Sequence, residues 1–248
     1  MDIPHFLTHE IRVQHHECGP DGLLKLNCVL DYFQNIAAQH AVYLGVGMED
    51  LQAQHQLWVL SRLKLKTIRM PQLDEKLTVL TYPSGLNRLF ATRQYQLLDE
   101  KGEQCVVGTS FWIMIDDEKF RPVRPSPALA QFDKLNPDKE RFYPQLDKIA
   151  EPEEILESQI NYTVRHSHID LNRHLNNAFY GAFLTDTLGY LTDRLCHPAE
   201  LQINFLHPGA VNDCILCGGE LKKDGSFYVE GRSSEDRTLL YFQAEGKL

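Results

Sequence analysis

The two halves of the chain carry the same residues in the same order at constant spacing, and this constrains the fold more than any other feature. Three residues recur 137 positions later, and three near the start of the first half recur 149 positions later. The pairs are Pro71–Pro208, Phe90–Phe227 and Asp99–Asp236, then Asp21–Asp170, Leu26–Leu175 and Asn27–Asn176. Ordered matches of this kind indicate an internal duplication. The change of spacing predicts extra residues in the first half, at 46–56.

Each half combines one long helical pattern with a following run of strands. Apolar residues recur at spacings of three and four over residues 26–44 and again over residues 175–195, which predicts two helices. Strand patterns follow each helix, with polar turns between them. They cover residues 57–68, 77–82, 89–98 and 105–115, then residues 200–206, 214–221, 227–233 and 238–244.

A long apolar helix and an antiparallel sheet each need a partner to cover an apolar face. We therefore predict an α+β fold, a tandem double hotdog in which an antiparallel sheet wraps a long central helix in each half. Residues 1–120 are predicted to form the N-terminal hotdog and residues 155–248 the C-terminal hotdog. Residues 121–154 are rich in proline and charge, which predicts a linker.

Charge and hydropathy exclude several classes of protein. The 25 lysines and arginines stand against 34 aspartates and glutamates, and a net charge of −9 argues against a nucleic-acid partner. No run approaches the roughly 20 apolar residues that a membrane span needs. The N-terminus carries no signal or transit pattern, so we expect a cytoplasmic protein.

The cysteines do not predict a metal or redox site. Cys214 and Cys217 are close in sequence, but no second pair of ligands stands at metal-binding spacing. Their neighbours read as a strand, in which residues three apart point to opposite faces. We expect two ordinary reduced thiols and no metal ion.

A polar cluster just before the second helix is the strongest candidate for chemistry. Asp170, Asn172 and His174 alternate with other residues, and an extended segment would place all three on one side. Asp170 could hold an imidazole, Asn172 could orient a water or an acyl oxygen, and His174 could act as general base. The helix N-terminus would supply backbone N–H groups for an oxyanion.

A structural role for the same residues stays open, because Asp and Asn are preferred helix caps. The duplication favours function for Asn172 and His174. At a spacing of 149 the first half has Asp21, Leu23 and Lys25, and neither Leu23 nor Lys25 could do that chemistry. We therefore predict one active half and one degenerate half.

Several motifs in the same order resemble the acyl-ACP thioesterases of plants and bacteria. Residues 170–180 read Asp-x-Asn-x-His-x-Asn-Asn-x-x-Tyr, which resembles the motif of that family's C-terminal half. The resemblance covers most of the chain. In the first half it rests on the segments 57–62, 69–71, 81–85, 88–95, 99–102 and 110–112.

The resemblance implies hydrolysis of the thioester between a fatty acyl chain and the phosphopantetheine arm of acyl carrier protein, which releases free fatty acid and the carrier thiol. It places Asp170, Asn172 and His174 on catalytic positions. Plant members also use a glutamate on the strand after the helix, and His207 stands at that position here. Either His207 takes over part of the water-activating role, or the carboxylate is dispensable or supplied elsewhere and His207 is structural.

The resemblance also implies an apolar slot for the acyl chain, shaped by the first half. Phe33, Ile36 and Trp58 are candidate wall residues, with ordinary core packing as the alternative. No metal or organic cofactor is implied, and the chain would act as a monomer or homodimer. The acyl carrier protein is acidic, so docking needs a local cationic surface. Candidates are Lys64, Lys66, Arg69, Arg121, Arg124, Lys134 and Lys139.

Three other functions stay open. An acyl-CoA thioesterase would differ only in the carrier, which the motif does not distinguish. A hotdog enoyl-thioester hydratase or dehydratase also uses Asp, Asn and His, usually with a proline between Asn and His, where this chain has Arg173. An acyl-binding module without activity is the third.

Overall fold

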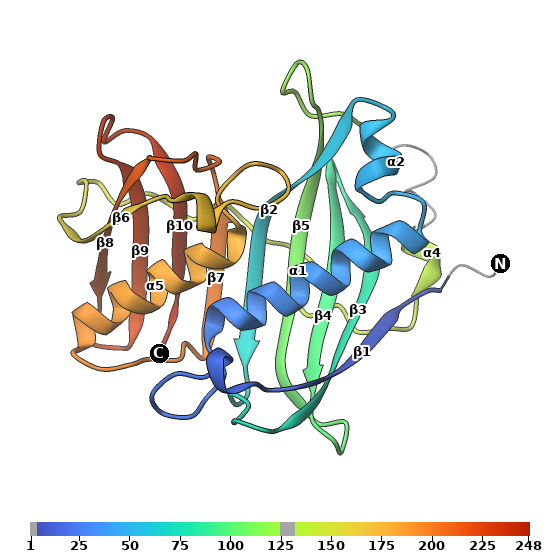
Figure 1. The fold of residues 1–248 in the computed structure, drawn as a ribbon, viewed down its shortest axis with the longest axis horizontal. Helices are drawn as coiled ribbons and strands as arrows, with labels where there is room; N and C mark the ends of the chain where they lie inside the picture. Colours follow the sequence, from blue (N-terminus) through green and yellow to red (C-terminus); the bar gives the residue numbers. More distant parts are fainter. Residues whose placement is uncertain (1–3, 125–131) are drawn as a thin grey trace. The chain divides into compact units, whose positions relative to one another are not determined.

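The fold is described from a computed structural model, which describes residues 4–124 and 132–248 (Figure 1). Contacts divide the chain into two compact units. The first holds the chain up to Lys25 together with Asp31–Leu146, and the second holds Leu26–Leu30 together with Asp147–Leu248. Over the described residues, no helix has both the length and the apolar character to cross a membrane.

The first unit is a five-stranded antiparallel sheet with the long helix α1 lying across one face (Figure 1). Its strands lie in the order β1-β3-β4-β5-β2. The elements are β1 Leu7–Arg12, η1 His15–Glu17, α1 Leu26–Tyr43, α2 Met48–Gln52, β2 Gln56–Thr67, β3 Lys76–Asn87, β4 Phe90–Leu98, β5 Gln104–Asp116 and α4 Phe132–Leu135.

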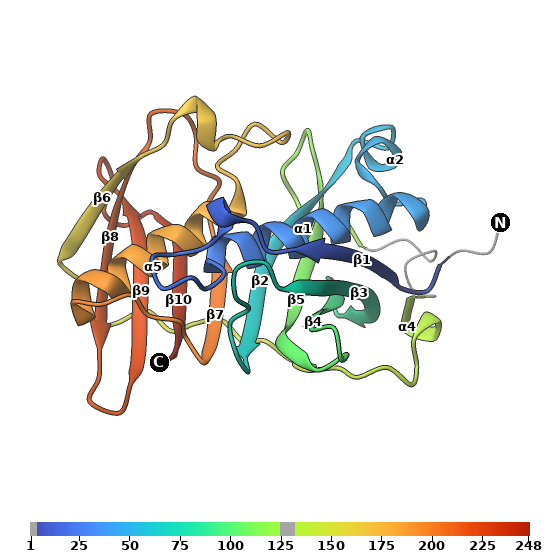
Figure 2. The ribbon, with the colours of Figure 1, turned by 60° about the horizontal axis from the view of Figure 1, so that its bottom comes forward.

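The second unit repeats this topology around α5, which lies on its sheet as Figure 2 shows. The elements are β6 Ser158–Thr163, η2 His166–His168, α5 Asn177–Thr192, β7 Glu200–Phe205, β8 Cys214–Leu221, β9 Ser226–Ser233 and β10 Leu240–Lys247. The strand order β6-β8-β9-β10-β7 matches that of the first unit, strand for strand. The predicted α+β double hotdog is confirmed. Helix α2 lies in the predicted extra stretch, and α5 runs on to β7 with no such helix between.

Local geometry shifts the ends of several predicted elements. Helix α5 begins at Asn177 rather than 175, because Leu175 pairs with Ile169 in a β-bridge. It ends at Thr192 rather than 195, because Asp193 adopts a left-handed conformation with φ of 54°. Strand β3 continues to Asn87, past the predicted end at 82, and carries a register shift between Pro83 and Gly85. Strand β10 begins at Leu240 and ends at Lys247, rather than covering the predicted residues 238–244.

The structure corrects the spacing of the duplication at the start of each helix. The equivalent backbone hydrogen bonds Gly19 N to Leu23 O and Asp170 N to His174 O lie 151 positions apart, not 149. The bridges Cys18–Leu24 and Ile169–Leu175 agree with the same spacing. The counterparts of Asp170, Asn172 and His174 are therefore Gly19, Asp21 and Leu23.

Aromatic side chains fill the space between each helix and its sheet. In the first unit Phe33 of α1 stacks on Tyr95 of β4, with ring centroids 4.7 Å apart. In the second unit Tyr180 of α5 lies against Phe242 of β10, and Phe183 stacks on Tyr162 of β6 at 3.9 Å. These buried aromatic contacts fix each helix on its sheet.

The segment predicted as a linker packs on both sheets over its described residues. In the first unit the backbone N–H of Phe142 donates to Gln94 and that of Tyr143 donates to Thr109, both at 3.1 Å. In the second unit Gln202 donates to the Asp147 carbonyl at 2.7 Å, and Arg232 pairs with Glu151. The domain boundaries at 120 and 155 stay a prediction.

A buried histidine predicts how the first unit responds to acid. Arg93 donates to Nδ1 of His40 at 2.9 Å, so Nε2 carries the proton and donates to the Pro4 carbonyl at 2.8 Å. Burial and the Arg93 charge lower the pKa of His40 to about 4. Between the usual pKa near 6.5 and this value the unfolded chain binds a proton that the folded chain does not, so acid destabilises the fold.

We expect the free energy of unfolding to fall by about 2 kcal/mol between pH 7.5 and pH 5 through His40 alone. Urea unfolding of the wild type and of His40→Gln at both pH values measures this contribution. The glutamine keeps one donor and one acceptor but does not titrate, so its stability should fall less. An equal fall in both proteins would contradict the assignment.

Candidate active site

The predicted catalytic residues lie in a tight turn that leads into α5, not in an extended segment. The Asp170 N–H donates to the His174 carbonyl at 2.9 Å, and the Arg173 N–H donates to the Asp170 carbonyl at 3.0 Å. Arg173 has φ of 64°, a left-handed conformation. The expectation that alternation along a strand aligns the three side chains was therefore wrong, because the chain reverses between Ile169 and Leu175.

Asp170 joins the members of this turn. Its Oδ1 accepts from the backbone N–H of Asn172 at 2.8 Å and from that of His174 at 3.4 Å. Its Oδ2 accepts from the Asn172 side-chain amide at 3.4 Å. Asp170 thus contacts the backbone of His174, not its ring. The geometry supports a role for Asp170 in fixing the positions of the other two.

Asn172 and His174 are exposed, whereas Asp170 is partly buried. Over the described residues the His174 imidazole has no hydrogen-bond partner. A base that must take a proton from water needs a free nitrogen that solvent can reach. His174 satisfies this requirement.

The start of α5 is capped by the protein itself. The Asn176 side chain accepts from the Ala178 N–H at 3.1 Å, and the Asn176 carbonyl accepts from Phe179 N–H at 2.9 Å. Two of the backbone donors expected to bind an oxyanion are therefore already occupied. The residue before the helix, rather than Asp170 or Asn172, is its cap.

His207 lies in a loop that is hydrogen-bonded to this turn. The Leu175 N–H donates to the Gly209 carbonyl at 2.8 Å, which places the two loops side by side. The exposed His207 ring meets the Tyr241 ring edge-on, with centroids 5.7 Å apart. Over the described residues it forms no hydrogen bond with Asp170, Asn172 or His174.

Three polar side chains beside this loop were not found by sequence analysis. The Tyr180 hydroxyl donates to the His207 carbonyl at 3.3 Å. Asp213 accepts from the Ala210 N–H at 2.7 Å, and its carboxylate interacts with the Tyr241 hydroxyl. Burial raises the pKa of Tyr241, and the bond to Asp213 adds to the shift. Tyr180 ends the motif of residues 170–180, but the motif does not give its contact with the His207 carbonyl. No sequence pattern marks Asp213 or Tyr241, because strand pairing brings them to this loop.

The candidate wall residues lie in the interior of the first unit. Phe33 and Ile36 are each 2% exposed, on the face of α1 that meets the sheet. Trp58 is partly buried and packs against the cluster of Leu51, Met114 and Phe132. These positions suit both core packing and an acyl slot, so their role as slot walls stays a prediction.

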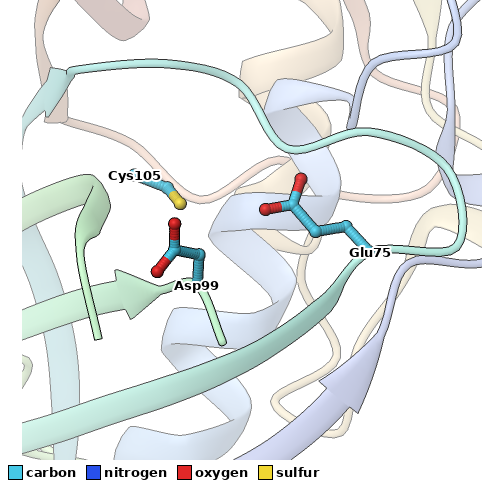
Figure 3. A group of neighbouring side chains, drawn as sticks. All are labelled: Glu75, Asp99 and Cys105. Atoms are coloured by element: carbon cyan, nitrogen blue, oxygen red, sulfur yellow. The ribbon is translucent and has the colours of Figure 1, made fainter. Parts of the chain in front are cut away.

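One group of side chains in the described part of the chain has the spacing of metal ligands. Figure 3 shows the Glu75 and Asp99 carboxylates and the Cys105 thiol facing one another, all within 4.8 Å. The Arg69 guanidinium donates to Glu75 at 3.0 Å and to Asp99 at 3.1 Å. Its positive charge already satisfies both carboxylates, so this group is an ion-pair network.

This network also corrects the expected cationic surface. Arg69 is paired with two carboxylates, which raises its pKa and removes it from the charges free to bind a partner. Lys64 lies over the Tyr143 ring at 4.9 Å, whereas Lys66 is exposed. The cationic candidates beyond the sheet, Arg121, Arg124 and Lys134, are exposed, and Lys139 lies over the Phe6 ring.

Cys214 and Cys217 are free thiols in β8, and their separation by three positions places them on opposite faces. Burial raises the pKa of Cys217, which keeps its thiol protonated. A low thiol pKa is what a reactive cysteine requires. The buried Cys217 is therefore an inert core residue.

Comparison with known families decides the relationship of the chain. Residues 5–131 match the acyl-ACP thioesterase N-terminal domain, and residues 152–227 match the acyl-ACP thioesterase C-terminal domain. The chain belongs to the acyl-ACP thioesterase family. The predicted family is thus confirmed, and the turn with Asp170, Asn172 and His174 lies in the part of the chain that matches the family's C-terminal domain.

Curated relatives come from plants. The chain is 22% identical over 212 residues to oleoyl-acyl carrier protein thioesterase 1 of Arabidopsis thaliana. The matched region covers 77% of this chain and 56% of the plant protein. It is 22% identical to an acyl-[acyl-carrier-protein] hydrolase of Cuphea viscosissima, covering 71% of this chain and 45% of that one. The chain thus spans about half the length of these relatives.

Solved structures show the same fold along the whole chain. An acyl-ACP thioesterase from Bacteroides thetaiotaomicron superposes with a TM-score of 0.81 at 21% identity, covering 98% of this chain and 97% of that one. The 12:0-ACP thioesterase from Umbellularia californica superposes with a TM-score of 0.78 at 15% identity, covering 98% and 97%. At these identities the likeness concerns the fold alone.

Proposed function

We propose that the chain hydrolyses fatty acyl-[acyl carrier protein] and releases free fatty acid and the carrier thiol. The observation that carries the proposal is one exposed turn with Asp170, Asn172 and His174 at the start of a buried helix, in a chain of this family. Its counterpart in the first unit, with Gly19, Asp21 and Leu23, has neither the imidazole nor the amide.

In the proposed reaction a water oxygen attacks the carbonyl carbon of the thioester while His174 accepts the water proton. Asn172 orients the water or the acyl oxygen, and Asp170 holds the turn that carries both. The tetrahedral intermediate then collapses with cleavage of the carbon–sulfur bond, and the carrier thiolate leaves. A thiol has a reference pKa of about 8.5, so the thiolate leaves without a strong general acid. The proton then returns to the sulfur.

His207 is the second candidate base. Its loop is bonded to the catalytic turn through Leu175 and Gly209, and its ring is exposed on the same unit. We infer that it faces the water or the leaving group and supplies part of the role that a glutamate has in plant members of the family.

The proposed partner is an acyl carrier protein. Its acidic surface would contact exposed cations such as Lys66, Arg121 and Arg124, since the chain as a whole is net negative. The cytoplasmic location and the choice between monomer and homodimer stay predictions.

A substrate screen tests the proposal against its alternatives. We expect turnover of saturated acyl-carrier substrates at higher kcat/KM than of the same acyl chains on CoA, measured as free thiol released. Better turnover on CoA would favour an acyl-CoA thioesterase. Hydration of a 2-enoyl thioester would favour a hydratase, and binding without turnover of any chain length would favour the acyl-binding module.

A further inference from the structure

A bulge in β10 directs one buried tyrosine toward the loop of residues 206–213, which we call the His207 loop. The register between β9 and β10 shifts between Leu240 and Phe242, so Tyr241 is the extra residue. Bulges of this kind redirect a side chain and are frequent beside active sites. The Tyr241 carbonyl accepts from the backbone N–H groups of Leu206 and His207, at 2.9 and 3.2 Å.

The Tyr241 side chain reaches the same loop from its other end. Its hydroxyl interacts with the Asp213 carboxylate and with Ser233, and Asp213 itself accepts from the Ala210 N–H at 2.7 Å. Its ring meets the His207 ring edge-on, and the residue is 3% exposed. Tyr241 therefore contacts the His207 loop at its start through the backbone and the ring, and at its end through Asp213.

The first unit contains the same construction with different chemistry. Cys105 is the bulged residue of β5, and its carbonyl accepts from the N–H groups of Ile68 and Arg69. By strand register and backbone hydrogen bonds, His207, Asp213, Ser233 and Tyr241 correspond to Arg69, Glu75, Asp99 and Cys105. Asp99 therefore matches Ser233 and not Asp236, the residue with which the sequence pairs it. The side-chain group in Figure 3 is thus the first unit's version of this cluster.

The two versions differ in the partners of the basic side chain, which is Arg69 in the first unit and His207 in the second. In the first unit two carboxylates hold the Arg69 guanidinium in ion pairs. In the second unit the Asp213 carboxylate interacts with the Tyr241 hydroxyl, and the His207 ring meets the Tyr241 ring and forms no hydrogen bond or ion pair among the described residues. The carboxylate therefore fixes the tyrosine, and the histidine keeps its nitrogens for other partners.

We propose that Tyr241, fixed by Asp213, is a positioning residue that orients His207 for thioester hydrolysis. This inference rests on the proposed function. The tyrosine does not touch substrate in this scheme. It sets the position of the loop backbone and the plane against which the His207 ring packs, and misplacement of a catalytic group by about 1 Å can cost on the order of 100-fold in rate.

Removal of the Tyr241 hydroxyl tests the proposal. We expect Tyr241→Phe to lower kcat about 10-fold, with KM changed by less than about twofold, because the ring stays but its anchor is lost. In a His207→Ala background the same substitution should cost almost nothing, since the group it positions is gone. The substrate is the acyl-carrier thioester that the wild type hydrolyses fastest.

The duplication supplies the matched control. Cys105→Ala changes the equivalent bulged residue in the first unit and should leave kcat and KM unchanged. Equal losses from Tyr241→Phe with and without His207, or no loss in the wild-type background, would overturn the proposal. A wild type that hydrolyses no acyl thioester would instead overturn the proposed function itself, so the two failures are distinct.

Discussion

His174→Ala is expected to lower kcat for acyl-carrier thioester hydrolysis by about 10²–10⁴-fold, the usual contribution of a general base. The imidazole is exposed and has no hydrogen-bond partner among the described residues, so its removal breaks no hydrogen bond with them. The bond that places this residue runs from its backbone N–H to Asp170, and alanine keeps it. The loss should therefore appear in kcat, measured by thiol release, and not in thermal unfolding.

Leu23→Ala is the control for this variant, because Leu23 occupies the equivalent position in the first unit. It should leave turnover intact. Affinity of both variants for a non-hydrolysable acyl-carrier analogue should match the wild type. Full turnover by His174→Ala would remove the histidine from the mechanism and leave His207, or a carboxylate acting through Asn172, as the base.

The helix-and-sheet organisation could be predicted from the sequence because hydrophobic periodicity reports burial directly. Helix α1 confirms this almost residue for residue. The spacing of the duplication could not be fixed as well, because identical residues at equal spacing need not be structurally equivalent. Asp21 and Asp170 match in sequence, but the residue in the first unit whose backbone hydrogen bonds are equivalent to those of Asp170 is Gly19.

The sequence identified the candidate catalytic residues by their residue types, but it did not predict their geometry. Alternation along the chain predicted that Asp170, Asn172 and His174 share a side, but a tight turn through a left-handed Arg173 brings them together. A non-glycine residue in the left-handed conformation is uncommon, and no residue pattern in this segment predicts it. Tyr241 and Asp213 could not be found either, since a bulge in the strand pairing creates their contact with the His207 loop.

Loss of Glu230 is expected to destabilise the second unit by about 3–5 kcal/mol, the usual cost of removing one partner of a buried ion pair. Arg232 then keeps the Glu151 carboxylate at 3.3 Å, but that side chain is 59% exposed. Glu230 and Arg232 lie two positions apart in β9, with side chains only 2% and 5% exposed. The Glu230 carboxylate accepts from Nε of Arg232 at 2.5 Å and from Nη2 at 2.9 Å. Tyr228 adds a third donor at 2.8 Å.

Urea unfolding of Glu230→Ala measures this cost, and two further variants separate its causes. In the double variant Glu230→Met with Arg232→Leu both charges are gone, so much of the stability should return. Glu100→Ala breaks the exposed pair between Glu100 and Lys76, whose side chains are 66% and 59% exposed, and should change stability by less than about 1 kcal/mol. If Glu230→Ala cost no more than Glu100→Ala, water would have to reach Arg232 in the folded protein, and the pair would not behave as a buried one.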